Sequence, residues 1–490
     1  PSGDDVVINN NIVLGAVLST TSLVVNSGFT FDLGSNIFTN SGTTSISGTL
    51  SDGNVAGANS FAGAVTINGS GIYNPANSTS VFNGGIINNG TFSTSGTSST
   101  IFSGTQSLSG GNFTFGSSLS VNSGTLTAAG IFNINISGTL TIAAAAIFDL
   151  GLSNFTCGVI AVNGTLSDGS ATGTNSFGAA TVGATGIFSL SASSLNTFKA
   201  GITNNNSAVG SFSVAGASTF NTASQNIAGV GPYVFLGDVT ISFNSITGSG
   251  ATTMSVGGNL SVSAASRFNV DQLTLTVSGT TTIALTGTLS DANSTGSNTF
   301  TGAVTNTGTF TNSSTSQFNF QNGFTNNGAF TSGTSAYVFR QNPQSIGGTG
   351  AISFTNLTIG QVADGLNIYT FNRNITVANL TFIKGVIATG VNTLTISTSV
   401  SGNSATTGWV NGLTSMPFAV GTNVTNVYPI GDASNYLPVT VVFPSVTTAG
   451  TLTVNSVGGD YSLFPNSCLN QIKKVSRNWN VINASTVPLS

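Results

Sequence analysis

The sequence predicts an all-β fold: a parallel β-helix (β-solenoid) built of three super-repeats of about 119 residues, followed by a small antiparallel β-sandwich-like domain. The first observation is composition, because Thr, Val, Ile, Phe, Asn and Gly abound and favour strands and tight turns over helices. The second is the return of whole phrases at a long, regular period. The third is a shorter period, in which alternating apolar and polar segments recur about every ten residues.

The long period is clearest at three glutamines in the related phrases "TQSLSG", "SQNIAG" and "PQSIGG". Gln106, Gln225 and Gln344 are separated by 119 residues both times. We therefore expect a solenoid over residues 1–380 that contains three super-repeats. Their expected bounds are roughly 20–139, 140–257 and 258–377.

The short period predicts a coil of roughly 20 residues, so that each strand lies about 4.8 Å from its counterpart in the next coil. Inward positions would then stack Phe, Ile, Leu and Val in columns, while Asn and Thr form hydrogen-bonded ladders. A charge repeated in every coil would face its own copy and be repelled. This architecture therefore explains why only 4% of the residues are charged.

Composition shifts near residue 380, and we expect residues 381–490 to form the β-sandwich-like domain, complete or partial in this chain, that caps the solenoid. Six of the ten prolines and both tryptophans lie beyond residue 400, and the 119-residue period is lost there. The cationic cluster of Lys473, Lys474 and Arg477 also lies there. We interpret it as a solvated edge; the alternative is contact with an acidic surface of a neighbouring subunit.

A net charge of −4 over 490 residues excludes a basic stripe for nucleic acid. The chain also has no run of about 20 apolar residues, so membrane insertion is not expected. A nearly uncharged surface has little to keep copies apart, which predicts a homo-oligomer or homopolymer. The chain begins at Pro1 without Met, so either a leader has been removed or this is an internal fragment.

Residues that usually carry catalysis are scarce. The chain has no His and no Glu, and its first 198 residues contain no Lys or Arg. Nucleophile–histidine pairs are therefore impossible, and paired carboxylates with a basic partner are not expected. Cys157 and Cys468 are predicted to be separate buried thiols, the alternative being a disulfide bond or an intermolecular role. The sequence thus predicts a protein that is not an enzyme and has no cofactor, calcium being the one candidate.

The phrase "SGTLSDGNVAGANSFAG" returns as "NGTLSDGSATGTNSFGA" and "TGTLSDANSTGSNTFTG", each time with one aspartate. In every super-repeat a second aspartate precedes it by 19 or 20 residues, about one coil. Each pair could share a Ca²⁺ ion with nearby oxygens. The alternative, which we favour, is that each aspartate only makes an Asx turn with its own backbone. The candidates are Asp32 with Asp52, Asp149 with Asp168, and Asp271 with Asp291.

Several phrases together resemble secreted, repeat-rich, adhesin-like surface proteins of the Bacteroidota that are associated with type IX secretion. They are "PSGDDVVINNNIVL" at the start, "NNGTF" before "TQSLSG", "FTNLTI", "VYPIGDASNYLPVTVVF" and "VSRNWNV". The resemblance implies an extracellular, cell-surface location. It also implies that the chain is a processed or partial segment of a larger protein, since the usual flanking segments are missing. No binding residue is carried over from that family.

The function that we expect is therefore structural and non-catalytic: an extracellular, self-associating subunit of a cell-surface filament or stalk. The alternative is an adhesin or binding module that recognises glycans or surfaces.

Overall fold

The computed structural model describes residues 3–53, 55–169, 172–222, 224–250, 252–292, 296–462 and 476–483. Every regular element in these ranges is a β-strand, which confirms the all-β prediction. Over the same ranges no helix is long and apolar enough to cross a membrane. The chain divides into two compact units, residues 1–258 and 259–490. This division falls next to the expected junction between the second and third super-repeats.

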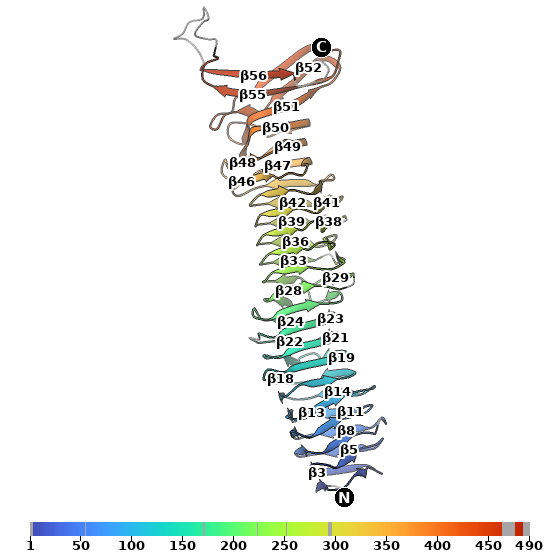
Figure 1. The fold of residues 1–490 in the computed structure, drawn as a ribbon. Coiled ribbons are helices and arrows are strands. Elements are labelled where there is room, and N and C mark those ends of the chain that lie inside the picture. The colour runs from blue at the N-terminus through green and yellow to red at the C-terminus, as the bar shows by residue number, and fades with distance from the viewer. Residues whose placement is uncertain are drawn as a thin grey trace, which may run out of the picture. The chain divides into compact units, whose positions relative to one another are not determined.

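The first unit is a parallel β-solenoid with three short strands in each turn, as predicted. Each strand pairs in parallel with its counterpart one turn later: β7 with β10, β8 with β11 and β9 with β12. Figure 1 shows the successive layers. The bounds of these strands are β7 (Thr49–Ser51), β8 (Ala58–Phe61), β9 (Val65–Ile67), β10 (Ile72–Asn74), β11 (Thr79–Phe82) and β12 (Ile86–Asn88).

Stacked aromatic rings fill the inside of the solenoid. Alternate residues of each strand point inward, and parallel pairing places like side chains above one another. Phe61, Phe82 and Phe102 are fully buried, with ring centroids 5.1 and 5.5 Å apart along the stack. The predicted Phe columns are therefore core. The later phrases repeat the stack in Phe177, Phe198 and Phe220, and in Phe300, Phe320 and Phe339.

The recurring glutamine is a corner residue that ties one turn to the next. The Gln106 amide donates to the carbonyl of Phe82 over 2.7 Å and accepts the N–H of Gly85 over 2.9 Å. Both partners lie in the preceding turn, at the bend after β11. The Gln106 side chain thus satisfies the Gly85 N–H at the bend and gives the Phe82 carbonyl a second bond, since that carbonyl also accepts the N–H of Ser103 at 3.1 Å.

Gln344 repeats both bonds in the third super-repeat, to Phe320 at 3.0 Å and from Gly323 at 2.9 Å. Gln225 donates to Phe198 at 3.0 Å, but its Oε1 atom has no hydrogen-bond partner within the described residues. The 119-residue period in the sequence is therefore the period of this corner.

The second unit continues the same architecture, but the parallel ladder extends beyond the expected boundary at residue 380. β49 (Ile375–Phe382) pairs in parallel with β50 (Gly385–Ser401), and β50 pairs in parallel with β51 (Gly408–Phe418). Composition changes earlier than topology: Trp409 and Pro417 lie within β51, a strand that still pairs in parallel with β50. The tail thus begins within the last turn of the solenoid.

Small antiparallel sheets close this unit, as predicted. β51 pairs antiparallel with β55 (Gly450–Gly458), which pairs with β56 (Arg477–Asn483). A separate two-stranded sheet joins β52 (Gly421–Tyr428) to β54 (Val439–Val446). Antiparallel pairing covers the edge that β51 would otherwise leave open.

Candidate functional site

The aspartate of the recurring phrase is buried, and in the first copy it binds the next turn of the chain. Asp52 is 0% exposed, and its carboxylate accepts the backbone N–H groups of Ala76, Asn77 and Ser78 at 2.8–2.9 Å. Burial alone would raise the pKa of Asp52, but these hydrogen bonds hold it below the ordinary value of 3.8. Neither alternative from the sequence anticipated this arrangement.

The second and third copies add a buried asparagine partner seven residues later. Asn175 donates to Asp168 at 3.3 Å, and Asn298 donates to Asp291 at 3.0 Å. Asp168 also accepts the N–H of Ser191 one turn on, and the hydroxyl of Ser316 donates to Asp291 at 2.7 Å. In the first copy, the equivalent asparagine, Asn59, is buried without a hydrogen-bond partner among the described residues.

The outer aspartates make the Asx turns that the alternative predicted. Asp32 accepts the N–H of Gly34 at 2.9 Å, and Asp149 accepts the N–H of Gly151 at 3.1 Å. In the ladder, Asp32 lies opposite Ser51 and not opposite Asp52. The outer carboxylate therefore lies on the outside of the sheet, whereas the inner one is turned into the core.

The third pair is not equivalent to the other two, which corrects the expectation from spacing. Asn269 occupies the position of Asp32, since it precedes the same tight turn and pairs with Ser290. Asp271 occupies the left-handed position that Gly34 holds in the first copy, with φ values of 49° and 54°. The 20-residue spacing between Asp271 and Asp291 therefore has a different origin from the other two: Asp271 is a residue of the tight turn and not the counterpart of Asp32.

The six candidates therefore do not form three matching sites. Among the described residues, no group of three or more His, Cys, Asp or Glu side chains lies together as a metal site would require. The buried carboxylates are already bound by N–H and O–H donors of the protein. Calcium stays a prediction, and the geometry favours a structural role for these aspartates.

Of the two cysteines, Cys157 is a buried free thiol, as predicted, and burial raises its pKa to about 12. Cys468 lies outside the described residues, as do Lys473 and Lys474. Arg477, the third member of the cationic cluster, is not a free solvated charge. It forms an ion pair with Asp432 that ties β56 to the loop after β53 (Ile430–Gly431).

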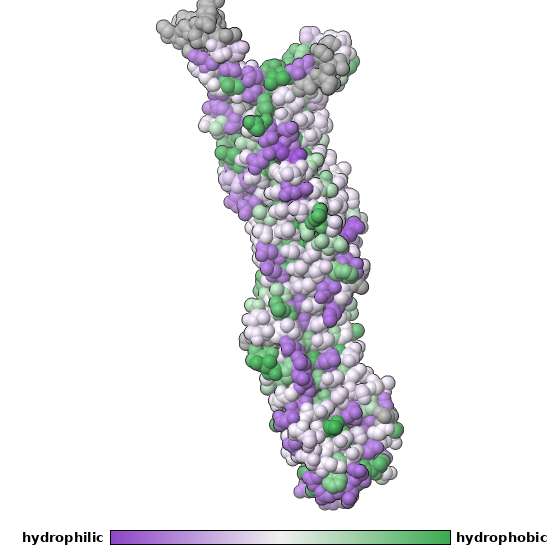
Figure 2. Space-filling view, in the orientation of Figure 1, coloured by the Kyte–Doolittle hydropathy of each residue, from purple (hydrophilic) through white to green (hydrophobic). Residues whose placement is uncertain are grey.

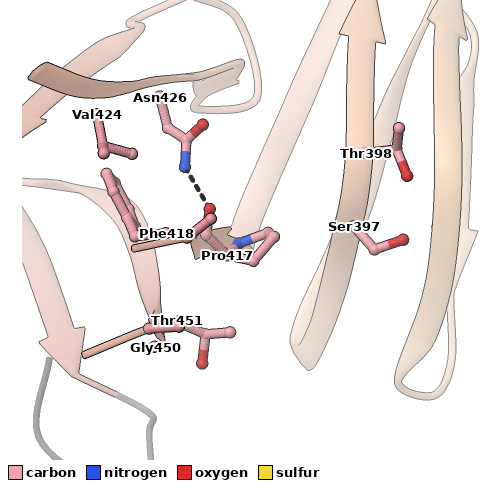
Figure 3. A pocket seen from close by; sticks show the side chains of 10 residues that line it. Ser397, Thr398, Pro417, Phe418, Val424, Asn426, Gly450 and Thr451 are labelled. Atoms are coloured by element: carbon pink, nitrogen blue, oxygen red, sulfur yellow. Dashed lines mark hydrogen bonds between the residues drawn. The ribbon is translucent and has the colours of Figure 1, made fainter. Parts of the chain in front are cut away.

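A pocket of about 600 Å³ lies in the second unit, between the end of the solenoid and the two-stranded sheet. Figure 3 shows Phe418 and Val424 on one side of it and Ser397 and Thr398 on the strand opposite. The Asn426 amide donates to the carbonyl of Pro417 at 2.7 Å, which leaves its oxygen as an acceptor. The lining also includes Ala419, Ala449, Gly450 and Thr451.

The pocket contains no charged side chain, so it can offer only hydroxyl, amide and backbone groups beside an apolar wall. Such a site suits an uncharged ligand that has both polar and apolar surface. No sequence pattern marks this pocket, because its residues come from four strands and their loops, each with ordinary alternation of apolar and polar residues.

Comparison with known proteins does not assign this chain to a family. No known family matches this chain. A search of curated proteins and a search of solved structures also found no significant match. The resemblance to surface proteins of the Bacteroidota therefore stays a prediction.

Proposed function

We propose that this protein is a non-catalytic, extracellular structural protein, the self-associating subunit of a cell-surface filament or stalk. The observation that supports it most is the combination of a parallel solenoid with outward positions that carry almost no charge. Solenoids of this kind present long, regular surfaces, and charge is what usually prevents such surfaces from associating.

The exposed surface agrees with this proposal. On the face drawn in Figure 2, pale residues of near-neutral hydropathy prevail between smaller purple and green areas. Exposed aliphatic residues are scattered over the first unit, such as Ile37 at 52% and Val159 at 46% exposure. A surface of this composition has no strong electrostatic repulsion between copies.

Electron microscopy of the purified chain, with sedimentation velocity over a range of concentrations, tests the proposal. We expect regular polymers or lateral bundles whose proportion rises with concentration. Particles that stay monomeric at every concentration would contradict it.

The pocket supports a second candidate function, an adhesin that binds a neutral glycan. Its uncharged polar lining matches sugar hydroxyls, and the wall of Pro417, Phe418 and Val424 could pack against the apolar face of a ring. A glycan array distinguishes the two functions. Binding that is lost on Asn426→Leu, in a chain that stays monomeric, would favour the adhesin.

A further inference from the structure

One face of the first unit carries no charge over eight consecutive strands. It consists of β5 (Ile37–Asn40), β8, β11, β14 (Ser99–Phe102), β17 (Ser118–Val121) and the second halves of β19 (Asn133–Ile142), β21 (Asn154–Val162) and β23 (Thr174–Val182). We call it the uncharged face. Several of these strands are labelled one above another in Figure 1.

Two columns of outward side chains cover the uncharged face, and no bulge interrupts the ladder along it. Most are the β-branched residues Ile, Val and Thr, and the others are Ser and Ala. The columns are Ile37, Ala58, Thr79, Ser99, Ser118, Thr139, Val159, Ala179, and Thr39, Ser60, Val81, Ile101, Ser120, Thr141, Ala161, Thr181.

The charges of this unit lie elsewhere. Among the described residues, Asp4 and Asp5 lie in the first turn, Asp32 and Asp149 on other strands, and Lys199 and Asp238 in bends. Asp52 and Asp168 are buried.

The neighbouring face also lacks charge from β7 through β10 to the first halves of β19 and β21, but its outward positions carry asparagines. They are Asn74, Asn133, Asn135 and Asn154. The outward columns of the uncharged face contain only Ile, Val, Thr, Ser and Ala, and this combination of small polar and aliphatic side chains distinguishes it.

We propose that the uncharged face is the lateral interface between two copies of this chain. The inference rests on the proposed function, since it names the surface through which self-association occurs. Ridges of side chains on this face repeat every 4.8 Å or so, and interdigitation along its whole length needs a partner with the same spacing. A second copy of this chain has the same strand-to-strand spacing because it has the same fold, whereas a globular partner does not.

The available area is sufficient for a specific contact. Eight strands at about 4.8 Å extend about 38 Å, and roughly four residues of each strand span about 13 Å. The face therefore offers about 500 Å² per copy, or about 1,000 Å² for the pair, which reaches the size of a specific interface. Short side chains that lose little rotamer entropy favour close face-to-face packing.

Paired lysine variants test the proposal with a matched control. Ser60→Lys with Ser120→Lys adds two charges to the uncharged face, and Thr66→Lys with Ser109→Lys adds two to outward positions of β9 and β15 (Gln106–Gly110). We expect the first pair to raise the apparent Kd of association by about tenfold or more, because an interface penalises unpaired buried charge. The control pair should associate like the parent. Strand content by circular dichroism checks folding.

The outcomes separate the two proposals. If the parent associates and both lysine pairs behave alike, the assignment of this face is wrong while self-association stands. If the parent is monomeric throughout, the proposed function fails as well. Should the lysine variants not fold, cysteine variants replace them. Oxidised Ser120→Cys should then give a disulfide-linked dimer and Ser109→Cys should not, and equal cross-linking would overturn the assignment.

Discussion

The backbone N–H of Ser78 donates to the carboxylate of Asp52 over 2.8 Å, across one turn of the solenoid. Two neighbouring N–H groups point to the same carboxylate, so a turn that leaves the ladder is held by the turn before it. The aspartate of the recurring phrase therefore holds the bend of the following turn in place through hydrogen bonds.

Asp52→Asn should destabilise the first unit by about 1.5–3 kcal/mol, because an amide NH₂ would face donors that now bind a charged acceptor. The midpoint of thermal unfolding measures the loss, and faster hydrogen exchange of the Ser78 amide would locate it. Ser51→Asn, on the outer side of the same strand, is the control and should change little. Equal effects of the two substitutions would contradict the role of the Asp52 carboxylate as the acceptor of these three N–H groups.

The contribution of Asp52 also depends on pH in a definite direction. Its pKa is lowered in the folded state, so the stabilisation is fully present above about pH 4 and is lost as pH falls through the folded-state pKa. The unfolding midpoints of the parent and Asp52→Asn should differ at neutral pH and converge in acid. A difference that persists unchanged in strong acid would exclude the carboxylate as its cause.

The three corner glutamines should differ in importance although their phrases are alike. Gln106 and Gln344 each donate to a carbonyl and also accept a backbone N–H group, whereas Gln225, within the described part of the chain, only donates to the carbonyl of Phe198. Removing a buried bond partner costs about 1–3 kcal/mol for each group left unsatisfied. Substitution by alanine should therefore lower the unfolding midpoint more at Gln106 and Gln344 than at Gln225. The reverse order would contradict the assignment of the corner bonds.

Periodicity predicted the fold class because a parallel solenoid repeats the same contacts in every turn. The columns of Phe61, Phe82 and Phe102, and the corner at Gln106, follow from that repetition. The end of the solenoid could not be placed from composition, since Trp409 and Pro417 lie within β51, which still pairs in parallel with β50.

The candidate sites were harder to predict, because spacing alone does not say on which side of a strand a residue lies. Alignment of "FDLG", "FDLG" and "FNVD" would have revealed that Asp271 replaces Gly34 and not Asp32. The pocket beside Phe418 could not be predicted from any local sequence pattern, since it depends on how β52 packs against β51. Contacts between residues that lie far apart in the sequence decide such features.

Asp271→Gly should stabilise the second unit by about 1 kcal/mol, because a non-glycine residue at positive φ carries strain. Gly34→Asp should destabilise the first unit by a similar amount. Unfolding midpoints measured with added Ca²⁺ and with EDTA test the calcium hypothesis together with this one. A midpoint that rises with Ca²⁺ in the parent but not in Asp271→Gly would show that Asp271 is a ligand.

Arg477 should fasten the last strand to the end of the solenoid through Asp432. Burial opposes ionisation of Asp432, but the N–H groups of Ser434 and Asn435, the Asn435 amide and the Arg477 guanidinium lower its pKa to about 2. The carbonyl of Asp432 also accepts the indole N–H of Trp409 at 2.7 Å, which joins the loop to β51.

Arg477→Gln should therefore raise the pKa of Asp432 only partly towards its ordinary value, since the bonds from Ser434 and Asn435 remain. Titration of the Asp432 carboxyl carbon by NMR measures this shift. Because the folded-state pKa is lowered, the pair stabilises the tail above about pH 4 and loses that effect as pH falls towards 2. We expect Arg477→Gln to speed hydrogen exchange in β56 at neutral pH, and Arg373→Gln, whose guanidinium binds backbone carbonyls of the solenoid, to leave β56 unchanged. Unaltered exchange in β56 after loss of Arg477 would mean that backbone pairing with β55 holds the strand without the ion pair.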